Sequence, residues 1–193
     1  LTVTGRERGT GKWLMWHHAW AHRIVLDRRK DIAPRLLDFE KDGDLTIVDQ
    51  PGDDVLQVAD VICRIRDAGL LPTKNAIGVD AAGIGDVVDE LVSPGRDISM
   101  DQIIAISQGW KLNGAIKTTE RKLAGGEMAH CGTRLMNWCA GNARIVQNGN
   151  AISITKQASG SAKIDPLMST FDANSLMSLR PEASNHEPSI RWL

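Results

Sequence analysis

The sequence predicts an α/β protein with a mixed β-sheet flanked by helices, and two observations support that prediction. In the middle of the chain, short apolar runs alternate with amphipathic stretches in the order strand, helix, strand, helix, strand. This order is typical of crossover connections and of a partly parallel sheet. At the start, Leu1–Thr4 and Lys12–Trp20 are β-prone and are joined by a short polar turn, which favours an antiparallel pair.

Composition limits what the protein can be. Its 193 residues, 42% of them hydrophobic, suffice for one buried core, so one domain is expected. The 23 Lys and Arg residues against 24 Asp and Glu residues give a formal net charge of −1, which confines any nucleic-acid contact to local patches. Three cysteines without a Cys-x-x-Cys pair, and no apolar run near the roughly 20 residues of a membrane span, predict an intracellular protein. Because the chain opens on Leu1 in a strand-like run, we expect it to be a fragment of something longer.

The first half of the chain continues with a helix, a strand and a second helix. A helix is predicted over Asp27–Phe39 and a short strand over Leu45–Val48. An amphipathic helix over Val55–Ala68 follows, and Gly69 ends it. The first of these helices carries a basic cluster that is expected to be a solvated face, with nucleic-acid contact as the alternative, and its members are Arg28, Arg29, Lys30 and Arg35.

The second half contains the rest of the sheet. Its strands and helices are predicted as a strand at 75–80, a helix at 85–92, a strand at 103–107, a helix ending near 124 and a helix from 133 to about 143. Asn148-Gly149 between two β-prone arms is a strong hairpin signal. Asp165-Pro166 opens a terminal helix that runs to Met177, and the polar tail 181–193 is expected to be loosely held.

Two aspartates carry the candidate chemistry. Asp80 ends a buried strand, which is where ligands gather in an open α/β sheet, although a salt bridge or a turn-stabilising hydrogen bond would also account for it. Asp165 has the position of a helix N-cap followed by proline. Alternatively, the terminal helix brings Asp165 beside Asp80, and the two carboxylates hold Mg²⁺ or Mn²⁺. A pair of such metals would activate water for phosphodiester cleavage.

Two other motifs are weaker. His18 and His22 have the spacing of zinc ligands on a helix, but Ala19 stands where that motif needs glutamate, so a structural or surface role is expected. Gly83-Ile84-Gly85 resembles the start of a dinucleotide fingerprint, but Val88 stands at its third glycine position. A nucleotide-binding regulatory domain would need the amides of these glycines open to a phosphate.

Several short runs, taken in their order along the chain, carry a resemblance to a known family. They are Lys12-Trp13-Leu14-Met15-Trp16, Ile77-Gly78-Val79-Asp80-Ala81-Ala82-Gly83, Gln108-Gly109-Trp110-Lys111-Leu112, Gly141-Asn142-Ala143-Arg144, Gly149-Asn150-Ala151-Ile152, Thr155-Lys156-Gln157-Ala158-Ser159-Gly160 and Lys163-Ile164-Asp165-Pro166. Together they resemble the C-terminal nuclease domain of the large terminase subunit of tailed bacteriophages and prophages. The resemblance extends from about Gly5 to Arg180.

The resemblance implies an RNase H-like fold over residues 1–180, with 181–193 as a C-terminal tail. It implies a metal-dependent endodeoxyribonuclease that cuts concatemeric phage DNA during genome packaging, with two Mg²⁺ or Mn²⁺ ions as cofactors. Asp80 matches the family's acid at the end of the central strand, and Asp165 matches the acid at the last helix, so both are expected to be catalytic metal ligands. The family's other acid lies on a first strand that is expected upstream of Leu1, where the packaging ATPase domain would also lie.

The resemblance also implies partners and a location. The partners are double-stranded phage DNA and, in the parent protein, the portal protein and the small terminase subunit, in the cytoplasm of the bacterial host and without a membrane. Basic side chains are expected to contact DNA phosphates, with ordinary helix surface as the alternative, and they are Lys111, Lys117, Arg121, Lys122, Lys156 and Lys163. The alternative function is a non-catalytic docking module of the packaging motor, which predicts separated aspartates and a broad exposed apolar patch.

Overall fold

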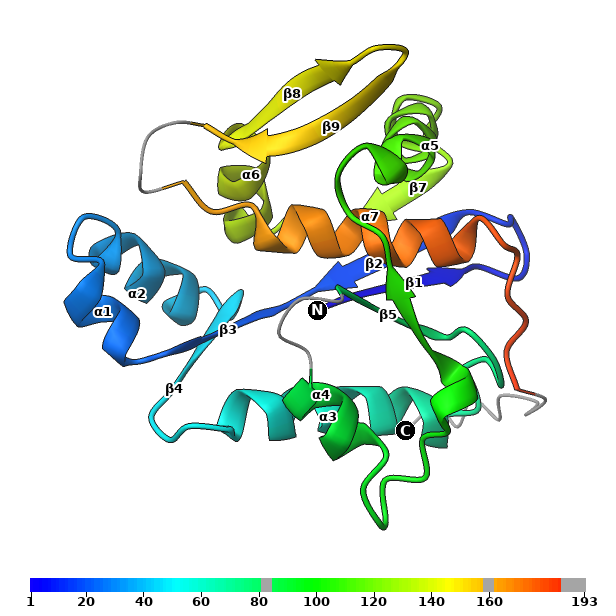
Figure 1. Cartoon of the computed structure of the whole chain (residues 1–193), viewed down its shortest axis with the longest axis horizontal. Helices are drawn as coiled ribbons and strands as arrows, with labels where there is room; N and C mark the ends of the chain where they lie inside the picture. Colours follow the sequence, from blue (N-terminus) through cyan, green and yellow to red (C-terminus); the bar gives the residue numbers. More distant parts are fainter. Residues whose placement is uncertain (81–84, 158–161, 185–193) are drawn as a thin grey trace.

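Helices flank several small β-sheets in the structure, a computed structural model that describes residues 1–80, 85–157 and 162–184 (Figure 1). The strands are β1 (Thr2–Arg6), β2 (Trp13–His17), β3 (Ala19–His22), β4 (Leu45–Val48), β5 (Ile77–Asp80), β6 (Ile103–Ile106), β7 (Met128–His130), β8 (Ala143–Asn148) and β9 (Ala151–Lys156). The helices are α1 (Ile24–Arg28), α2 (Ala33–Lys41), α3 (Asp53–Asp67), α4 (Gly85–Leu91), α5 (Asn113–Ala124), α6 (Arg134–Gly141) and α7 (Asp165–Met177), with 3₁₀ turns η1 (Met100–Gln102) and η2 (Gly109–Leu112). The mixed α/β class predicted from the sequence is confirmed.

The first sheet has the strand order β1-β2-β7. β1 and β2 are antiparallel, as predicted, and their register runs from Thr2 opposite His17 to Arg6 opposite Trp13. β7 pairs with β2 in parallel and begins with Met128 opposite Trp13. One sheet therefore contains both pairing directions.

Side chains alternate along β2 as expected for a strand with one covered face. Trp13, Met15 and His17 are buried, whereas Leu14 and Trp16 between them are exposed. The buried side chains face α7, because Trp13 and Met15 pack in one cluster with Met177 of that helix. The exposed side chains lie on the opposite face of the strand.

The remaining strands form pairs. β3 pairs with β4 and β5 pairs with β6, both in parallel, while β8 and β9 form an antiparallel hairpin. Each parallel pair is joined by a helical crossover, through α1 and α2 in the first case and through α4 in the second. The alternation of strands and helices in the sequence correctly indicated these crossovers.

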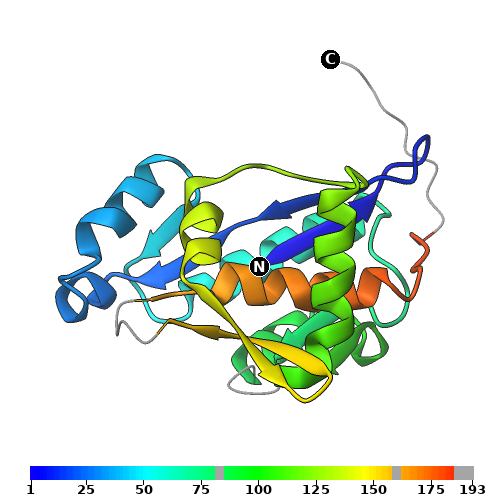
Figure 2. The same cartoon turned by 90° about the horizontal axis from the view of Figure 1, so that it is seen from above.

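Helix α7 crosses the middle of the molecule, as Figures 1 and 2 both show. The hydroxyls of Thr2 and Ser169 share a hydrogen bond of 2.6 Å, and Thr4 Oγ1 donates to Asn174 Oδ1 at 3.1 Å, so β1 lies along this helix. Asn174 is fully buried, and its Nδ2 donates to Thr119 Oγ1 of α5 at 2.9 Å. α7 therefore joins the first sheet to α5 through a buried polar contact.

Hydrophobic side chains are buried in separate clusters. One cluster joins α2, β4 and α6, and another joins α3, α4 and β5. α7 supplies Met177 to a third cluster with Trp13 and Met128, and Phe171 to a fourth cluster that includes Leu112 beside α5. Among the residues that the structure describes, no helix is both long and apolar enough to cross a membrane.

The helix predicted over Asp27–Phe39 is wrong as a single element, because the structure has two helices there, α1 and α2. Pro34 lies in the first turn of α2. A proline is tolerated there because that turn has no intrahelical acceptor for its N–H, but in a helix interior it removes a hydrogen bond and clashes with the preceding turn. The chain therefore begins a new helix at Ala33.

Two further features of the fold differ from the sequence prediction. β7 was not predicted, because its three residues are too few to show a period. The hairpin is confirmed, but Asn148 pairs with Ala151, so the two loop residues are Gly149 and Asn150. Gly149 has a φ of 60°, as the first central residue of a type II′ turn requires.

Candidate functional site

Asp80 lies at the carboxyl end of β5, where the sequence predicted it. Ile77 at the start of this strand is buried, whereas the Asp80 side chain at its end is exposed. In the parallel pair, Asp80 lies opposite Ile106 of β6. The segment 81–84 between the predicted strand and helix, which includes most of the Gly83-Ile84-Gly85 motif, lies outside the described residues.

An unpredicted acid, Asp172, lies near Asp80. It is on α7, and only 8% of it is exposed. Burial raises the pKa of the Asp172 carboxyl, the Gln108 hydrogen bond to it lowers that pKa, and the charge of Asp80 raises it again. Gln108 Nε2 donates to Asp172 Oδ1 at 2.9 Å. The structure therefore brings Asp80 together with a buried carboxyl group of the last helix.

Asp165 is in the first turn of α7, and its side chain is exposed. The N-cap interpretation of this residue is wrong, because Ile164 occupies the cap position and no side chain forms a capping hydrogen bond. Asp165 lines a cavity of about 320 Å³ together with Leu1, Trp20 and Asp54. It is thus placed at a hollow between β1, β3 and the start of α3.

The two acids of α7 lie on one side of the helix. Asp172 lies seven positions after Asp165, which is about two turns, or roughly 10 Å along the axis. Asp80 interacts with Asp172 in this arrangement, and the convergence of Asp80 with Asp165 stays a prediction. Within the described ranges, no group of three or more His, Cys, Asp or Glu side chains is arranged to hold a metal ion.

The residues present still suit a hard divalent cation in their chemistry. Asp80 and Asp172 are carboxylates close enough for the charge of one to raise the pKa of the other. Carboxylate oxygens are the ligands that Mg²⁺ and Mn²⁺ prefer, and a cation between two such groups would relieve their repulsion. In its chemistry, Asp80 is therefore a suitable ligand for such a cation.

The predicted DNA-contacting residues near α5 have different surroundings. Lys117 and Arg121 are exposed and lie four apart, hence on one face of the helix. Lys111 is exposed too, but it belongs to η2, which precedes α5. Lys122 lies over the ring of Trp13, 4.7 Å from its centroid, and its Nζ pairs at 3.0 Å with a glutamate carboxylate within the chain.

The other two predicted contacts are close to the last helix in sequence. Lys156 is exposed at the end of β9, and Lys163 is half-buried two residues before Asp165. The hairpin that ends in Lys156 extends from the body of the molecule in Figure 1. These positions leave the charge of Lys156 accessible from solvent.

The paired histidines have structural contacts. His18 Nε2 shares a hydrogen bond of 2.8 Å with the Thr46 hydroxyl, and His22 Nδ1 accepts one from the Ile24 N–H at 3.2 Å. His22 belongs to a strand and His18 directly precedes that strand. Four residues of extended chain span about 13 Å, too far for both side chains to bind one zinc ion.

Comparison with known proteins relates the fold to one solved structure. No protein-family model matches the chain, and no curated protein matches its sequence. The crystal structure of the HK97 bacteriophage large terminase is similar over 89% of this chain, with a TM-score of 0.62 and 19% sequence identity. The chain spans 35% of that protein. At this identity the similarity shows a shared fold with a part of that terminase.

Proposed function

We propose that this chain, over residues 1–180, is the nuclease domain of a phage-type large terminase, a divalent-metal-dependent endodeoxyribonuclease that cuts concatemeric DNA during genome packaging. The observation that carries the proposal is the position of Asp80 at the carboxyl end of β5, facing the acid-bearing helix α7. The fold shared with a part of the HK97 large terminase supports it. Its partners would be double-stranded DNA, the portal protein and the small terminase subunit, in the cytoplasm of the bacterial host.

In this proposal the carboxylates of the chain hold Mg²⁺ or Mn²⁺. Asp80 would supply oxygen ligands from the end of β5, and Asp165 would supply them from the first turn of α7. The metal ions, when bound, supply an activated water and stabilise the leaving oxygen of the cleaved phosphodiester. Asp172 lies beside Asp80, so its charge state tunes how strongly this edge of the sheet attracts a cation.

The basic side chains would hold the DNA backbone. Lys117 and Arg121 form an exposed pair on α5. Lys111 precedes this pair in the sequence, and Lys156 and Lys163 follow it. Lys and Arg contacts to phosphates position a duplex without reading its sequence. Because Lys122 is already engaged with Trp13 and a carboxylate, we expect its removal to affect the fold more than DNA binding.

Nicking of supercoiled plasmid in Mn²⁺ tests the proposal. The chain, and a longer version with the upstream strand that the resemblance implies, would each be compared with Asp80→Asn and Asp165→Asn variants. We expect both variants to lose activity by about 100-fold or more while keeping the parent's melting temperature. Asp38→Asn is the matched control, because Asp38 is an exposed acid of α2.

The same assay separates the proposal from its alternative. If the Asp80 and Asp165 variants cut as fast as the parent, the acids are structural and the nuclease proposal is wrong. A chain that cuts no DNA in either length but binds the portal protein or the small terminase subunit would be a docking module of the motor.

A further inference from the structure

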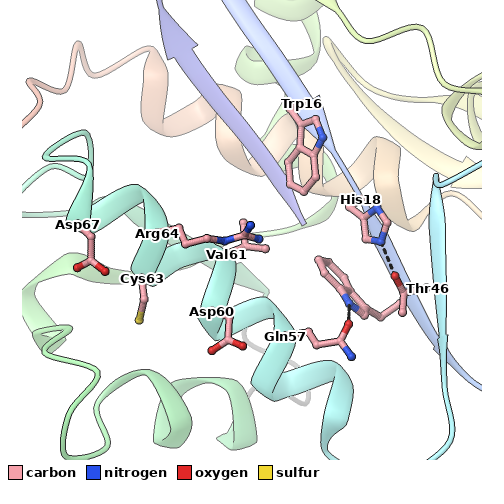
Figure 3. Close-up of a pocket in the computed structure, with 10 residues that line it drawn as sticks. Trp16, His18, Thr46, Gln57, Asp60, Val61, Cys63, Arg64 and Asp67 are labelled. Carbon is pink, nitrogen blue, oxygen red and sulfur yellow. Dashed lines mark hydrogen bonds between the residues drawn. The ribbon is translucent and has the colours of Figure 1, made fainter. Parts of the chain in front are cut away.

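A cavity of about 650 Å³ lies between the strands β2 and β3 and the helix α3, away from the acids discussed above. Figure 3 shows Trp16 and His18 on the strand side and Asp60 and Arg64 on the helix side. Its volume is within the range of small-molecule binding sites, which is about 300–1,000 Å³. Nothing in the proposed nuclease function uses this cavity.

Aromatic rings form one wall of the cavity. The rings of Trp16 and His18 are parallel to within 3°, with centroids 5.9 Å apart, and Trp20 meets His18 edge-on at 4.6 Å. Hydrogen bonds hold them in place, since Trp20 Nε1 donates to Gln57 Oε1 at 2.9 Å and His18 binds Thr46. Trp16 is 41% exposed. The wall is thus a preformed surface on which another flat ring can stack.

The opposite wall is polar, which is unusual for a helix that faces a strand. α3 uses Ala59 and Ile62 in the cluster with β5 and α4. The side toward the strands instead carries Gln57, Val61 and Arg64, while Asp60 lines the cavity from the flank of the helix that carries Cys63 (Figure 3). A helix covering a core presents an apolar stripe, so this space is not a part of the core. It is a lined hollow that water or a ligand fills.

The charged side chains on the α3 wall differ in whether they have an ion-pair partner. Asp60 pairs with Arg96, and Asp67 pairs with Arg66 at 2.7 Å. Arg64 forms no ion pair with any residue that the structure describes. The cavity therefore offers one uncommitted guanidinium, while its carboxylates keep lone pairs that can accept hydrogen bonds from an uncharged donor.

We propose that this cavity binds one nucleotide unit with an unpaired base. The base would stack on Trp16, and its phosphate would meet Arg64. Such a ligand uses both the aromatic wall and the uncommitted guanidinium. A cationic side chain would use the rings and carboxylates but would meet Arg64 as a like charge, and a bare phosphate would leave the rings unused.

The unit has two possible sources, a free nucleotide or a single strand of nucleic acid. Trp20 lines this cavity and also the smaller one that contains Asp165. A strand with one base on Trp16 could therefore continue along Trp20 toward the start of α7. A free nucleotide would use the larger cavity alone.

Binding measurements on the whole chain, without divalent metal, test the proposal. The ligands would be dAMP, dTMP, a short labelled oligo(dA) strand, and the same strand as a duplex. We expect the single strand to bind more tightly than the duplex, and dAMP more tightly than dTMP, because adenine offers the larger ring surface for stacking on Trp16. Trp16→Ala should weaken binding about five- to 150-fold, and Arg64→Gln about tenfold or more.

Matched controls remove a similar group elsewhere on the surface. Trp110→Ala removes an indole that is 60% exposed, and Arg8→Gln removes an exposed guanidinium in the turn between β1 and β2. Neither should change binding by more than twofold. Trp16→Phe should retain most of the affinity, because it keeps a ring at that position even if Trp16→Ala proves unstable.

Each outcome decides the proposal. Binding of dAMP and the single strand that depends on Trp16 and Arg64 supports it, and binding of only one of them identifies the source. If neither binds, if the duplex binds as tightly as the single strand, or if the control variants weaken binding as much as the cavity variants, the proposal is wrong. Because no nuclease acid is changed and no metal is added, failure here leaves the nuclease proposal standing.

Discussion

Asp172 illustrates how burial changes the pKa of a single carboxyl group. It is almost fully buried, it accepts one hydrogen bond from Gln108, and it faces the charge of Asp80. Burial raises its pKa because a charged carboxylate is poorly solvated there. In the folded protein the proton is therefore held more tightly than in the unfolded chain.

This shift predicts how stability changes with pH. The contribution of Asp172 to the free energy of unfolding should be largest below pH 3.9, which is about the pKa of this carboxyl in the unfolded chain. The contribution should fall as the pH rises through the higher pKa that the carboxyl has in the folded protein. Asp172→Asn keeps an oxygen that can accept from Gln108 and removes the titration. Relative to the parent, the variant should gain stability as pH rises from 4 to 7, measured by urea unfolding at several pH values.

The control for this prediction is Asp38→Asn, at an exposed acid of α2. Its unfolding free energy should track that of the parent across the same pH range. If Asp172→Asn also tracks the parent, the carboxyl of Asp172 is solvated in the folded state and the burial argument fails.

At the scale of elements, the sequence predicted the strands and helices whose hydrophobic pattern was regular or whose ends were marked by glycine. The alternation of buried Trp13 and Met15 with exposed Leu14 marked β2. Gly52 and Gly69, both with positive φ, border the segment that contains α3. β7 was missed because it is short and is stabilised by pairing with β2, which lies more than a hundred residues away in sequence.

The site was predictable only in part, for a similar reason. Asp80 could be placed because a strand that ends in a carboxylate has a fixed location at the edge of the sheet. Asp172 could not, because its burial depends on Gln108 and on the neighbouring strand end rather than on its own helix. The aromatic wall around Trp16 could not be predicted from the sequence either, because α3, which forms the opposite wall of the cavity, comes close to these rings only in the folded chain.

Gly78 of β5 illustrates a glycine required by close packing. A Cβ atom at this position would lie 2.9 Å from Ile106 Cγ1 and 3.1 Å from Leu176 Cδ1. Gly78→Ala should therefore lower the free energy of unfolding by about 1–3 kcal/mol, the usual cost of overpacking. Chemical denaturation measures the change.

Gly114→Ala is the matched control, since it adds the same methyl group in open space on α5. It should be neutral or should stabilise the protein by up to about 1 kcal/mol, because alanine favours helix over glycine. Equal destabilisation by both substitutions would show that Gly78 is not confined by its neighbours.

At the scale of the whole molecule, α7 links regions that are distant in sequence. Asn174 accepts from Thr4 of β1 and donates to Thr119 of α5, and its side chain is fully buried. Buried polar groups without partners are costly, whereas a satisfied network specifies one arrangement. Asn174 therefore fixes the position of α7 against both of its neighbours.

Asn174→Ala should be among the most destabilising substitutions outside the hydrophobic clusters. It leaves the hydroxyls of Thr4 and Thr119 without this partner and opens a cavity, so a loss of about 2–4 kcal/mol is expected in thermal or urea unfolding. Asn137→Ala, at an exposed position of α6, should change stability by less than about 0.5 kcal/mol. A small effect at Asn174 would mean that water replaces its hydrogen bonds.

The central position of α7 also has a consequence for synthesis of the protein. The hydrogen-bond partners Thr4 and Asn174 are 170 positions apart, so β1 leaves the ribosome long before the helix that covers it. At elongation rates of about 5–20 residues per second this delay is on the order of ten seconds or more. During that time the buried face of β2, with Trp13 and Met15, lacks α7 and is open to chaperones or to aggregation. A translational pause before residue 177 would lengthen this exposure.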